Sequence, residues 1–250
     1  MGPSTGNVIY GIEARASYAL GSFDERALFD MGADLDLMLA HSVQAQEGYI
    51  QPQELGALPI VDFELILAHF CIKHFDDVVG HNLNCEACGK KYAVEFSLGT
   101  YLGMLTSEVH RHTNADFRGY PLALPSRDII ANAGSEGLVT AIWAKTDPIS
   151  ADDLEALESY LEKACPILQE DVGGPCPECQ TAQTFRFILR DWVAAKLQTR
   201  LKGLIAQIHL LATHYHWRVD DIFALSRASR LALIDTIQGR TTRLTPAGTR

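Results

Sequence analysis

The chain is organised around two short cysteine motifs, Cys85-Glu86-Ala87-Cys88 and Cys176-Pro177-Glu178-Cys179. Each motif has the CxxC spacing of a knuckle, in which a tight turn presents two thiolates to one metal ion. A short run of alternating apolar and polar residues follows each motif, as is typical of a β-strand. The two motifs together supply the ligand set of a closed structural zinc site. We therefore predict that one structural Zn²⁺ is bound by Cys85, Cys88, Cys176 and Cys179.

The two motifs differ in detail. Gly89 follows the first motif and relieves a tight turn, with Tyr92 placed to cover the metal, whereas Gln180 follows the second. Pro177 gives the second motif the Cys-Pro-x-Cys form common in zinc ribbons. The insert between the motifs is long, but the entropy cost of closing a loop grows only logarithmically with its length. One shared site is therefore the favoured interpretation.

Three alternatives to a metal site are weaker. The chain has six cysteines, and disulfides are disfavoured because four of them lie in CxxC pairs and residues 1–10 lack the pattern of a signal peptide. A redox CxxC precedes a helix, and strands are expected here. Four reduced cysteines without a ligand are the third alternative. The remaining pair, Cys71 and Cys165, falls on helical stretches and is interpreted as buried core thiols.

Composition narrows the function classes. The net charge of −10 argues against general binding of nucleic acid, because phosphate requires a basic surface. No apolar run approaches the roughly 20 residues that span a bilayer, so membrane insertion is not expected. The sequence contains no Gly-rich phosphate loop, nucleophile elbow or HExxH motif, so we predict no enzymatic activity. We expect the protein in the cytoplasm, with incorporation into a larger particle as the alternative.

Hydrophobic periodicity predicts an α+β fold that is mostly helical. The expected strands cover residues 78–84, 90–98 and 184–189. The expected helices cover residues 23–45, 59–75, 99–110, 127–145 with a break near Gly134 and Gly137, 151–164, 192–215, 219–225 and 227–238. The expected N-caps of helices are Asp24, Asp62, Ser150 and Ser226.

The order helix, strand, CxxC, strand, helix occurs twice, over residues 58–105 and again over residues 150–211. This is a repeat of pattern with little identity, and it predicts two half-repeats joined by a zinc-ribbon-like Cys₄ site. The predicted segments are an N-terminal arm and helix (1–50), a first zinc-knuckle half (51–116), a central connector (117–149), a second half with the C-terminal helices (150–239) and a disordered tail (240–250).

Other candidate sites are weaker. His209 and His214 are five residues apart on an expected helix and share a face poorly, so a second metal site is disfavoured. The last two helices could form a helix-turn-helix in which Arg227 and Arg230 read bases. A zinc-ribbon regulator that binds nucleic acid is therefore the alternative function, and the acidic composition counts against it.

Four stretches carry a family resemblance. They are Leu55-Gly56-Ala57-Leu58-Pro59-Ile60-Val61-Asp62 followed by a helix and the first knuckle, Leu124-Pro125-Ser126-Arg127-Asp128, the second knuckle, and Ile208–Trp217 with Asp221–Arg227. They resemble the zinc-knuckle baseplate and hub assembly proteins of contractile phage tails and related contractile injection systems, whose central segment reads LPTGRD. The resemblance covers roughly residues 55–240. The first 50 residues fit it less well, and Gln180 departs from the glycine of the family pattern.

The resemblance implies a structural or assembly role in a baseplate or hub, either as a particle component or as an assembly chaperone. The implied partners are other baseplate, hub or spike proteins. It supplies no catalytic residues, and it implies that the same four cysteines ligate zinc.

Overall fold

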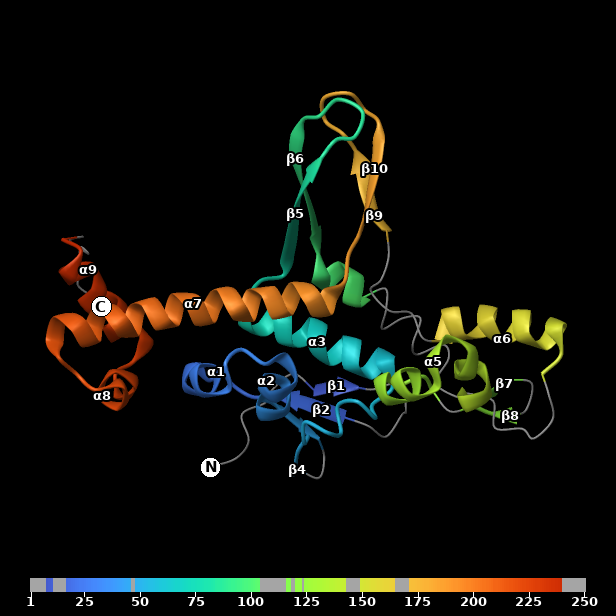
Figure 1. Cartoon of the computed structure of the whole chain (residues 1–250), viewed down its shortest axis with the longest axis horizontal. Coiled ribbons are helices and arrows are strands. Elements are labelled where there is room, and N and C mark those ends of the chain that lie inside the picture. Colours follow the sequence, from blue (N-terminus) through green and yellow to red (C-terminus); the bar gives the residue numbers. More distant parts are fainter. Residues whose placement is uncertain are drawn as a thin grey trace, which may run out of the picture. The chain divides into compact units, whose positions relative to one another are not determined.

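The structure is a computed structural model that describes residues 8–10, 17–45, 48–103, 116–117, 120–122, 124–142, 149–164 and 171–239 of the 250-residue chain. Helices and small antiparallel sheets are combined in it, as expected for a mixed α+β fold (Figure 1). Cys165 and the predicted tail at 240–250 lie outside the described residues.

The chain groups into two compact units. Unit 1 consists of Met1–Phe23 and Leu35–Ala194, and unit 2 consists of Asp24–Asp34 and Ala195–Arg250. The boundary between them falls within the long helix α7 (Leu189–Tyr215). The two units are groups of residues that lie close together in space. The five predicted segments are continuous stretches of sequence, so the two units do not test them and they stay a prediction.

The start of unit 1 is a four-stranded antiparallel sheet in the order β1-β2-β3-β4, next in sequence to helix α2 (Leu35–Ser42). The strands are β1 (Val8–Tyr10), β2 (Ser17–Leu20), β3 (Val43–Ala45) and β4 (Gly48–Tyr49).

The single helix predicted over residues 23–45 is wrong. Helix α1 (Glu25–Met31) ends at Gly32, which adopts the left-handed conformation with φ 70° and donates its N–H to the carbonyl of Leu28. Ala33 is also left-handed, with φ 62°, so the helix cannot continue through this turn. The predicted cap is confirmed, because Asp24 accepts hydrogen bonds from two backbone amides of the first turn.

Helix α3 (Ile60–His74) is the most buried element of unit 1, and its fully buried side chains include Phe63, Ile66 and Phe70. The prediction that Asp62 caps this helix is wrong. Asp62 lies inside the helix, is 1% exposed and accepts a 3.1 Å hydrogen bond from the Tyr18 hydroxyl. The N-cap is Pro59, which has no side chain that could cap and enters the helix from an extended conformation.

Two β-hairpins carry the cysteine motifs, and they run side by side with their loops at the same end (Figure 1). The first pairs β5 (Val78–Asn84) with β6 (Lys91–Ser97), close to the predicted bounds. The second pairs β9 (Asp171–Pro175) with β10 (Ala182–Arg186), so the strand predicted over 184–189 starts and ends earlier. The alternation predicted for the first hairpin is confirmed, because every second residue of β6 from Tyr92 is partly buried and the residues between are exposed.

A smaller apolar cluster in unit 1 joins helices α5 (Arg127–Ile142) and α6 (Ala151–Ala164) to the short strands β7 (Asp116–Phe117) and β8 (Tyr120–Pro121). The predicted break in α5 is wrong, because the helix runs through both of its glycines. A glycine costs a helix about 1 kcal/mol but keeps its N–H donor, so it weakens a helix without ending it. The cap of α6 is confirmed by the bond from the Asp153 amide to Ser150 Oγ (3.1 Å).

Unit 2 combines α1, the rest of α7, α8 (Val219–Ala224) and α9 (Arg227–Ile237). The rings of Phe29 and Phe223 meet edge to face at 5.5 Å and join α1 to α8. Ser226 caps α9 as predicted by accepting from the amide of Ser229 at 3.1 Å.

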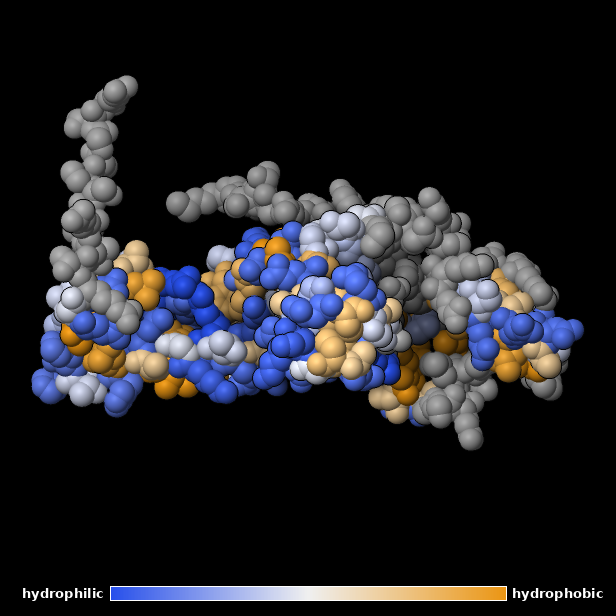
Figure 2. All heavy atoms as spheres, turned by 90° about the horizontal axis from the view of Figure 1, so that it is seen from above, coloured by the Kyte–Doolittle hydropathy of each residue, from blue (hydrophilic) through white to orange (hydrophobic). Residues whose placement is uncertain are grey.

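Among the described helices, none combines the length and the apolar character that crossing a bilayer requires. The face seen in Figure 2 carries hydrophobic residues in separate patches between hydrophilic ones. Exposed large hydrophobic side chains of the described residues are Leu37, Val78, Ile130, Ile205, Trp217 and Leu231.

Two neighbouring glycines of β9 allow a matched test of the second hairpin. A Cβ added to Gly173 would lie 2.4 Å from the backbone oxygen of Gln183 in β10, whereas a Cβ on Gly174 would meet nothing within 4 Å. Gly173→Ala should therefore destabilise the protein by about 1–3 kcal/mol, because a backbone atom cannot move aside as a side chain does. Gly174→Ala is the control and should leave the melting temperature nearly unchanged. Equal melting temperatures of the two variants, measured by circular dichroism, would contradict the observed pairing of β9 with β10.

Candidate metal centre

The two hairpins bring the four predicted cysteines together. The sulfur of Cys85 lies 3.5 Å from that of Cys179, and the sulfur of Cys88 lies 3.8 Å from that of Cys176. All four sulfurs lie within 4.8 Å of one another, and they form the one such group of potential metal ligands among the described residues. The two close pairs connect one hairpin to the other. The cluster therefore joins two stretches of chain that are far apart in the sequence.

The spacing of the sulfurs fits a tetrahedral metal ion. Four sulfurs about 2.3 Å from a central ion are roughly 3.8 Å apart. The observed pairs are close to this value and far from the roughly 2.05 Å of a disulfide bond. All four cysteines are free thiols. The cluster can therefore bind a metal ion without a large movement of the backbone.

The two loops have the same backbone geometry. In the first loop, the amide of Gly89 donates to the carbonyl of Cys85 at 2.8 Å, and in the second the amide of Gln180 donates to the carbonyl of Cys176 at 2.8 Å. Both residues are left-handed, with φ 70° at Gly89 and φ 60° at Gln180. The absence of a glycine after the second motif thus leaves the turn intact, and Gln180 adopts a conformation that favours glycine.

In each loop, a second backbone hydrogen bond joins the first cysteine of the motif to the residue just before the next strand. The amide of Cys85 donates to the carbonyl of Lys90, and the amide of Cys176 donates to the carbonyl of Thr181, both at 2.9 Å. The first cysteine of each motif is buried and the second is exposed. Each hairpin therefore presents one inner and one outer sulfur to the cluster.

The outer sulfurs receive different hydrogen bonds. The Thr181 hydroxyl lies 3.3 Å from the sulfur of Cys179, and together with the Thr181 amide it lowers the pKa of this thiol to about 6. The Lys90 amide lowers the pKa of Cys88, but burial and the neighbouring thiols outweigh it and raise this pKa to about 12. A bound metal cation would favour the thiolate form of all four. The pKa values of the two outer thiols are thus shifted in opposite directions.

Side-chain contacts along the strands hold the two hairpins against each other. His81 of β5 stacks on Phe185 of β10, with 4.6 Å between ring centroids and 11° between ring planes. Phe96 and Phe187 meet edge to face at 5.0 Å. These contacts were not predicted, because periodicity indicates which face of a strand is apolar but not which strand that face meets.

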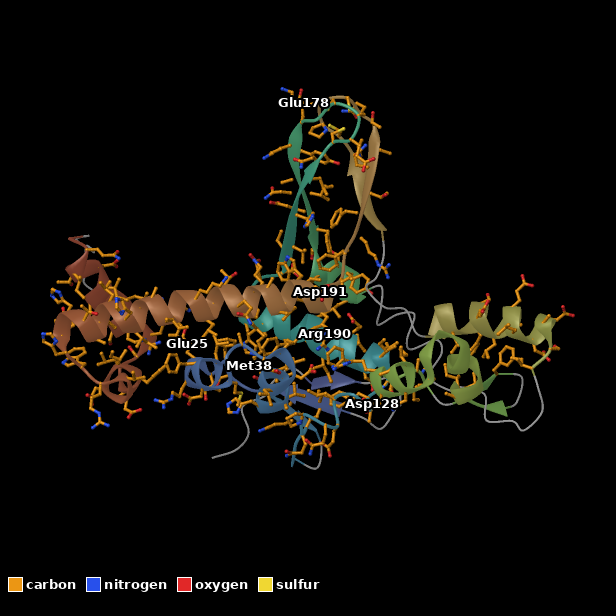
Figure 3. All side chains as sticks on the ribbon, viewed as in Figure 1. Glu25, Met38, Asp128, Glu178, Arg190 and Asp191 are labelled. Atoms are coloured by element: carbon orange, nitrogen blue, oxygen red, sulfur yellow. The ribbon has the colours of Figure 1, made fainter. Side chains whose placement is uncertain are left out.

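The loops and a tyrosine complete the surroundings of the cluster. The amide of Glu86 donates to the side-chain oxygen of Gln183 at 3.1 Å, which connects the loop of the first hairpin to the second hairpin. Glu178 lies at the far end of the hairpin pair (Figure 3). Tyr92 is partly buried, and the pKa of its hydroxyl is raised by burial and then by the charges of the four cysteines. The effect of the four cysteines on the pKa of Tyr92 agrees with the prediction that this residue lies beside the metal site.

The other thiol and histidine candidates do not join the cluster. Cys71 is buried in α3, and its sulfur bonds to the carbonyl of Asp76 at 3.5 Å, which agrees with its interpretation as a core thiol. The histidines His209 and His214 belong to no ligand group among the described residues.

A second set of residues that the sequence singled out meets elsewhere in unit 1. The stretch Leu55–Asp62 lies beside Leu124–Asp128. The amide of Ile60 donates to the carbonyl of Pro125 at 2.8 Å, and the amide of Asp128 donates to the carbonyl of Gly56 at 3.0 Å. A Cβ on Gly56 would lie 2.2 Å from a carboxylate oxygen of Asp128, so the glycine permits this close approach.

Arg127, next to this junction, shares one carboxylate with a second arginine. Asp36 of α2 accepts from both terminal nitrogens of Arg127 at 2.8 and 3.1 Å, and from both of Arg190 at 3.3 Å. Both guanidinium groups lie over the ring of Phe63, at 4.8 and 5.8 Å from its centroid. Burial raises the pKa of Asp36, but the two arginines outweigh it and lower this pKa overall. The roles of Asp36 and Arg190 were missed, because no motif connects residues so distant in sequence. Figure 3 labels Arg190.

Glu64 is a buried acid beside this group. It is 8% exposed, and its Oε2 has no hydrogen-bond partner among the described residues. Burial raises the pKa of Glu64 to about 7, against a smaller opposite effect of Arg190. Glu64 lies among apolar residues of α3. An acid within such an apolar run is the sequence signal that could have pointed to it.

The left-handed turn gives a prediction for the second loop. Gln180→Gly should stabilise the metal-loaded protein by about 0.5–1 kcal/mol, because glycine accepts a positive φ without steric cost. The reverse change at the equivalent position, Gly89→Gln, should destabilise it by a similar amount. Competition with a coloured chelator measures how readily each variant releases metal. Faster release from Gln180→Gly than from the unchanged protein would contradict the strain argument.

Two carboxylates of unit 1, the buried Glu64 and the partly exposed Asp36, give opposite pH predictions. The pKa of Glu64 is raised, so its stabilising effect is complete below pH 4.5 and is lost as pH rises through about 7. The melting temperature of the unchanged protein should therefore fall between pH 5 and pH 8 relative to that of Glu64→Gln, by the equivalent of at most about 3 kcal/mol.

Asp36→Asn is the matched control for this pH dependence. The pKa of Asp36 is lowered, so its contribution is present above the ordinary pKa of 3.8 and does not change between pH 5 and pH 8. The Asp36→Asn variant should be destabilised equally at both pH values. A constant difference between Glu64→Gln and the unchanged protein would mean that Glu64 is ionised throughout this range.

Comparison of the chain with protein-family models, with curated proteins and with solved structures finds no match.

Proposed function

We propose that the metal is zinc and that it acts as a structural staple between two half-repeats. Zn²⁺ prefers tetrahedral thiolate ligands, and a Cys₄ set is typical of its structural sites. The matching hydrogen bonds and left-handed turns of the two loops support a repeat, because each feature of the first loop has its counterpart in the second. The binding of zinc would contribute folding free energy directly, since the site does not exist in the unfolded chain.

We further propose that the protein is a structural or assembly component of the baseplate of a contractile tail or injection system. The observation that carries this proposal is the docking of Leu55–Asp62 on Leu124–Asp128 in a chain that also forms a paired-hairpin cysteine centre. These are the stretches that resemble the baseplate family, and their contacts give the resemblance a physical reason. The partners would be other baseplate, hub or spike proteins. The protein would be made in the cytoplasm and act there or within the particle.

Two other classes of function are less well supported. A zinc hydrolase needs an open coordination position, and four thiolates leave none. A regulator that reads bases with α9 would need both Arg227 and Arg230 at the surface. Arg230 is instead 4% exposed and bonded to Glu25. The acidic composition counts against this class as well.

The zinc staple gives a prediction for the cysteines. Purified protein should contain about one zinc ion per chain, and Cys85→Ser or Cys176→Ser should release the metal and lower the melting temperature sharply. Cys71→Ser is the control, because this thiol lies outside the cluster and serine keeps a donor for the Asp76 carbonyl. Elemental analysis together with thermal unfolding tests both effects. A Cys176→Ser variant that keeps its melting temperature would refute the staple, and two zinc ions per chain would refute the single site.

Gene deletion tests the assembly role. Removal of the gene from the organism that encodes it should abolish complete contractile tails in electron micrographs, and a plasmid copy should restore them. The Cys176→Ser copy should fail to restore tails, whereas the Cys71→Ser copy should succeed. Normal tails in the deletion strain would contradict the proposal. Neighbouring genes for sheath, tube and spike proteins would support it.

A further inference from the structure

The first turn of α9 carries charges opposite to those of an ordinary helix start. The N-terminal end of a helix is electrostatically positive and favours acidic residues. The helices α1, α3 and α6 follow this rule, with acids in their first turns. The first turn of α9 has no acid and contains Arg227 and Arg230 instead. The start of this eleven-residue helix therefore attracts anions more strongly than its neighbours do.

One carboxylate of unit 2 faces these arginines. Glu25 of α1 receives Arg230 on one oxygen, and on the other it receives Arg200 at 2.9 Å and Arg227 at 3.4 Å. The acids of the adjoining helix α8 do not substitute for it, since Asp220 is bound by Arg26 and Asp221 accepts from the amide of Arg218. The single negative charge of Glu25 thus faces three guanidinium groups at the positive N-terminal end of α9.

Arg230 is held rigidly at the base of this group. It is 4% exposed, its NH1 donates to the carbonyl of Leu225 at 2.9 Å, and its guanidinium lies over the ring of Phe223. Its Nε is buried without a hydrogen-bond partner among the described residues. A buried, charged donor without an acceptor is unfavourable, so the charge of Arg230 adds to the attraction of a further anion at the exposed side of this group.

Arg227 forms the accessible side of the group. Its side chain is 52% exposed, and its contact with Glu25 runs through Nε, at a distance longer than an ordinary charge-assisted hydrogen bond. The two terminal nitrogens of Arg227 have no partner in the part of the chain that the structure describes. A guanidinium offers such a pair as a fork that matches the two oxygens of a carboxylate.

We propose that the N-terminal turn of α9 binds a carboxylate of an acidic segment in a partner protein, with Arg227 as the exposed fork and Arg230 as the buried anchor. Glu25 holds the guanidinium groups in position before the partner arrives, which reduces the entropy lost on binding. The chain as a whole is acidic, so an acidic segment is repelled from most of its surface and is directed to this turn. The inference names the chemistry of a partner and depends on residues other than the cysteine centre.

Binding of a fluorescent hexaglutamate peptide to the full-length protein tests the proposal. We expect saturable binding at low salt that weakens as salt is added. Arg227→Gln should weaken it about tenfold, the effect of one charge-assisted hydrogen bond, and Arg227→Lys should recover only part of the loss. The Nε–Hε resonances of Arg227 and Arg230 should shift during the titration.

Lys202→Gln is the matched control, because it removes one positive charge from an exposed position on α7. Equal weakening by Lys202→Gln and Arg227→Gln would overturn the proposal in favour of a general charge effect. Absence of hexaglutamate binding at low salt would overturn it as well, as would binding of hexaglutamine with the same affinity. Displacement of the peptide by an equal concentration of inorganic phosphate would reassign the site to phosphate. None of these outcomes changes what is expected of the cysteine variants. The carboxylate site of α9 and the zinc staple can therefore be refuted independently.

Discussion

Unit 1 depends on the convergence of four cysteine sulfurs within 4.8 Å at the ends of two hairpins. A two-stranded hairpin is marginally stable by itself in water. Here each hairpin gains a partner through the stacked pair His81 and Phe185 and through the thiol cluster. The cluster also closes the long insert between the two motifs, whose freedom in the unfolded chain would otherwise oppose the pairing. A metal ion at this point would stabilise both hairpins and the closure together.

The two loops show that backbone hydrogen bonds, and not residue identity, define a knuckle. Both loops close with the same pair of bonds, although a glycine follows one motif and a glutamine follows the other. The glutamine adopts a left-handed φ that costs a side-chain-bearing residue about 1 kcal/mol. The two backbone bonds that close the turn hold its geometry, so the turn tolerates this strain.

Partly exposed charged groups connect the helices of unit 1. Asp36 from α2 holds arginines that belong to α5 and to the start of α7, and the ring of Phe63 in α3 lies under both. Ion pairs that are partly removed from water contribute little net stability, but loss of one partner leaves an uncompensated charge. These contacts therefore specify how the helices of unit 1 meet more than they add to the free energy of folding. The docking of Leu55–Asp62 on Leu124–Asp128 is part of the same arrangement.

The sequence by itself determined the local features of this protein. It identified the four clustered cysteines, the strands that flank the first motif, and the helix caps at Asp24, Ser150 and Ser226, because each depends on residues close together in the chain. It failed at Asp62, an acid near the start of a helix, because this residue is buried inside the helix and bonds to Tyr18, which is distant in sequence. It also failed over residues 23–45, because helical periodicity does not register the left-handed turn at Gly32 and Ala33 that ends the helix. Only the tertiary structure decided which hairpin faces meet, which acid holds Arg127 and Arg190, and that Glu25 faces Arg230. These contacts join residues distant in sequence, and no periodicity or spacing along the chain encodes which of many apolar or charged groups will become neighbours.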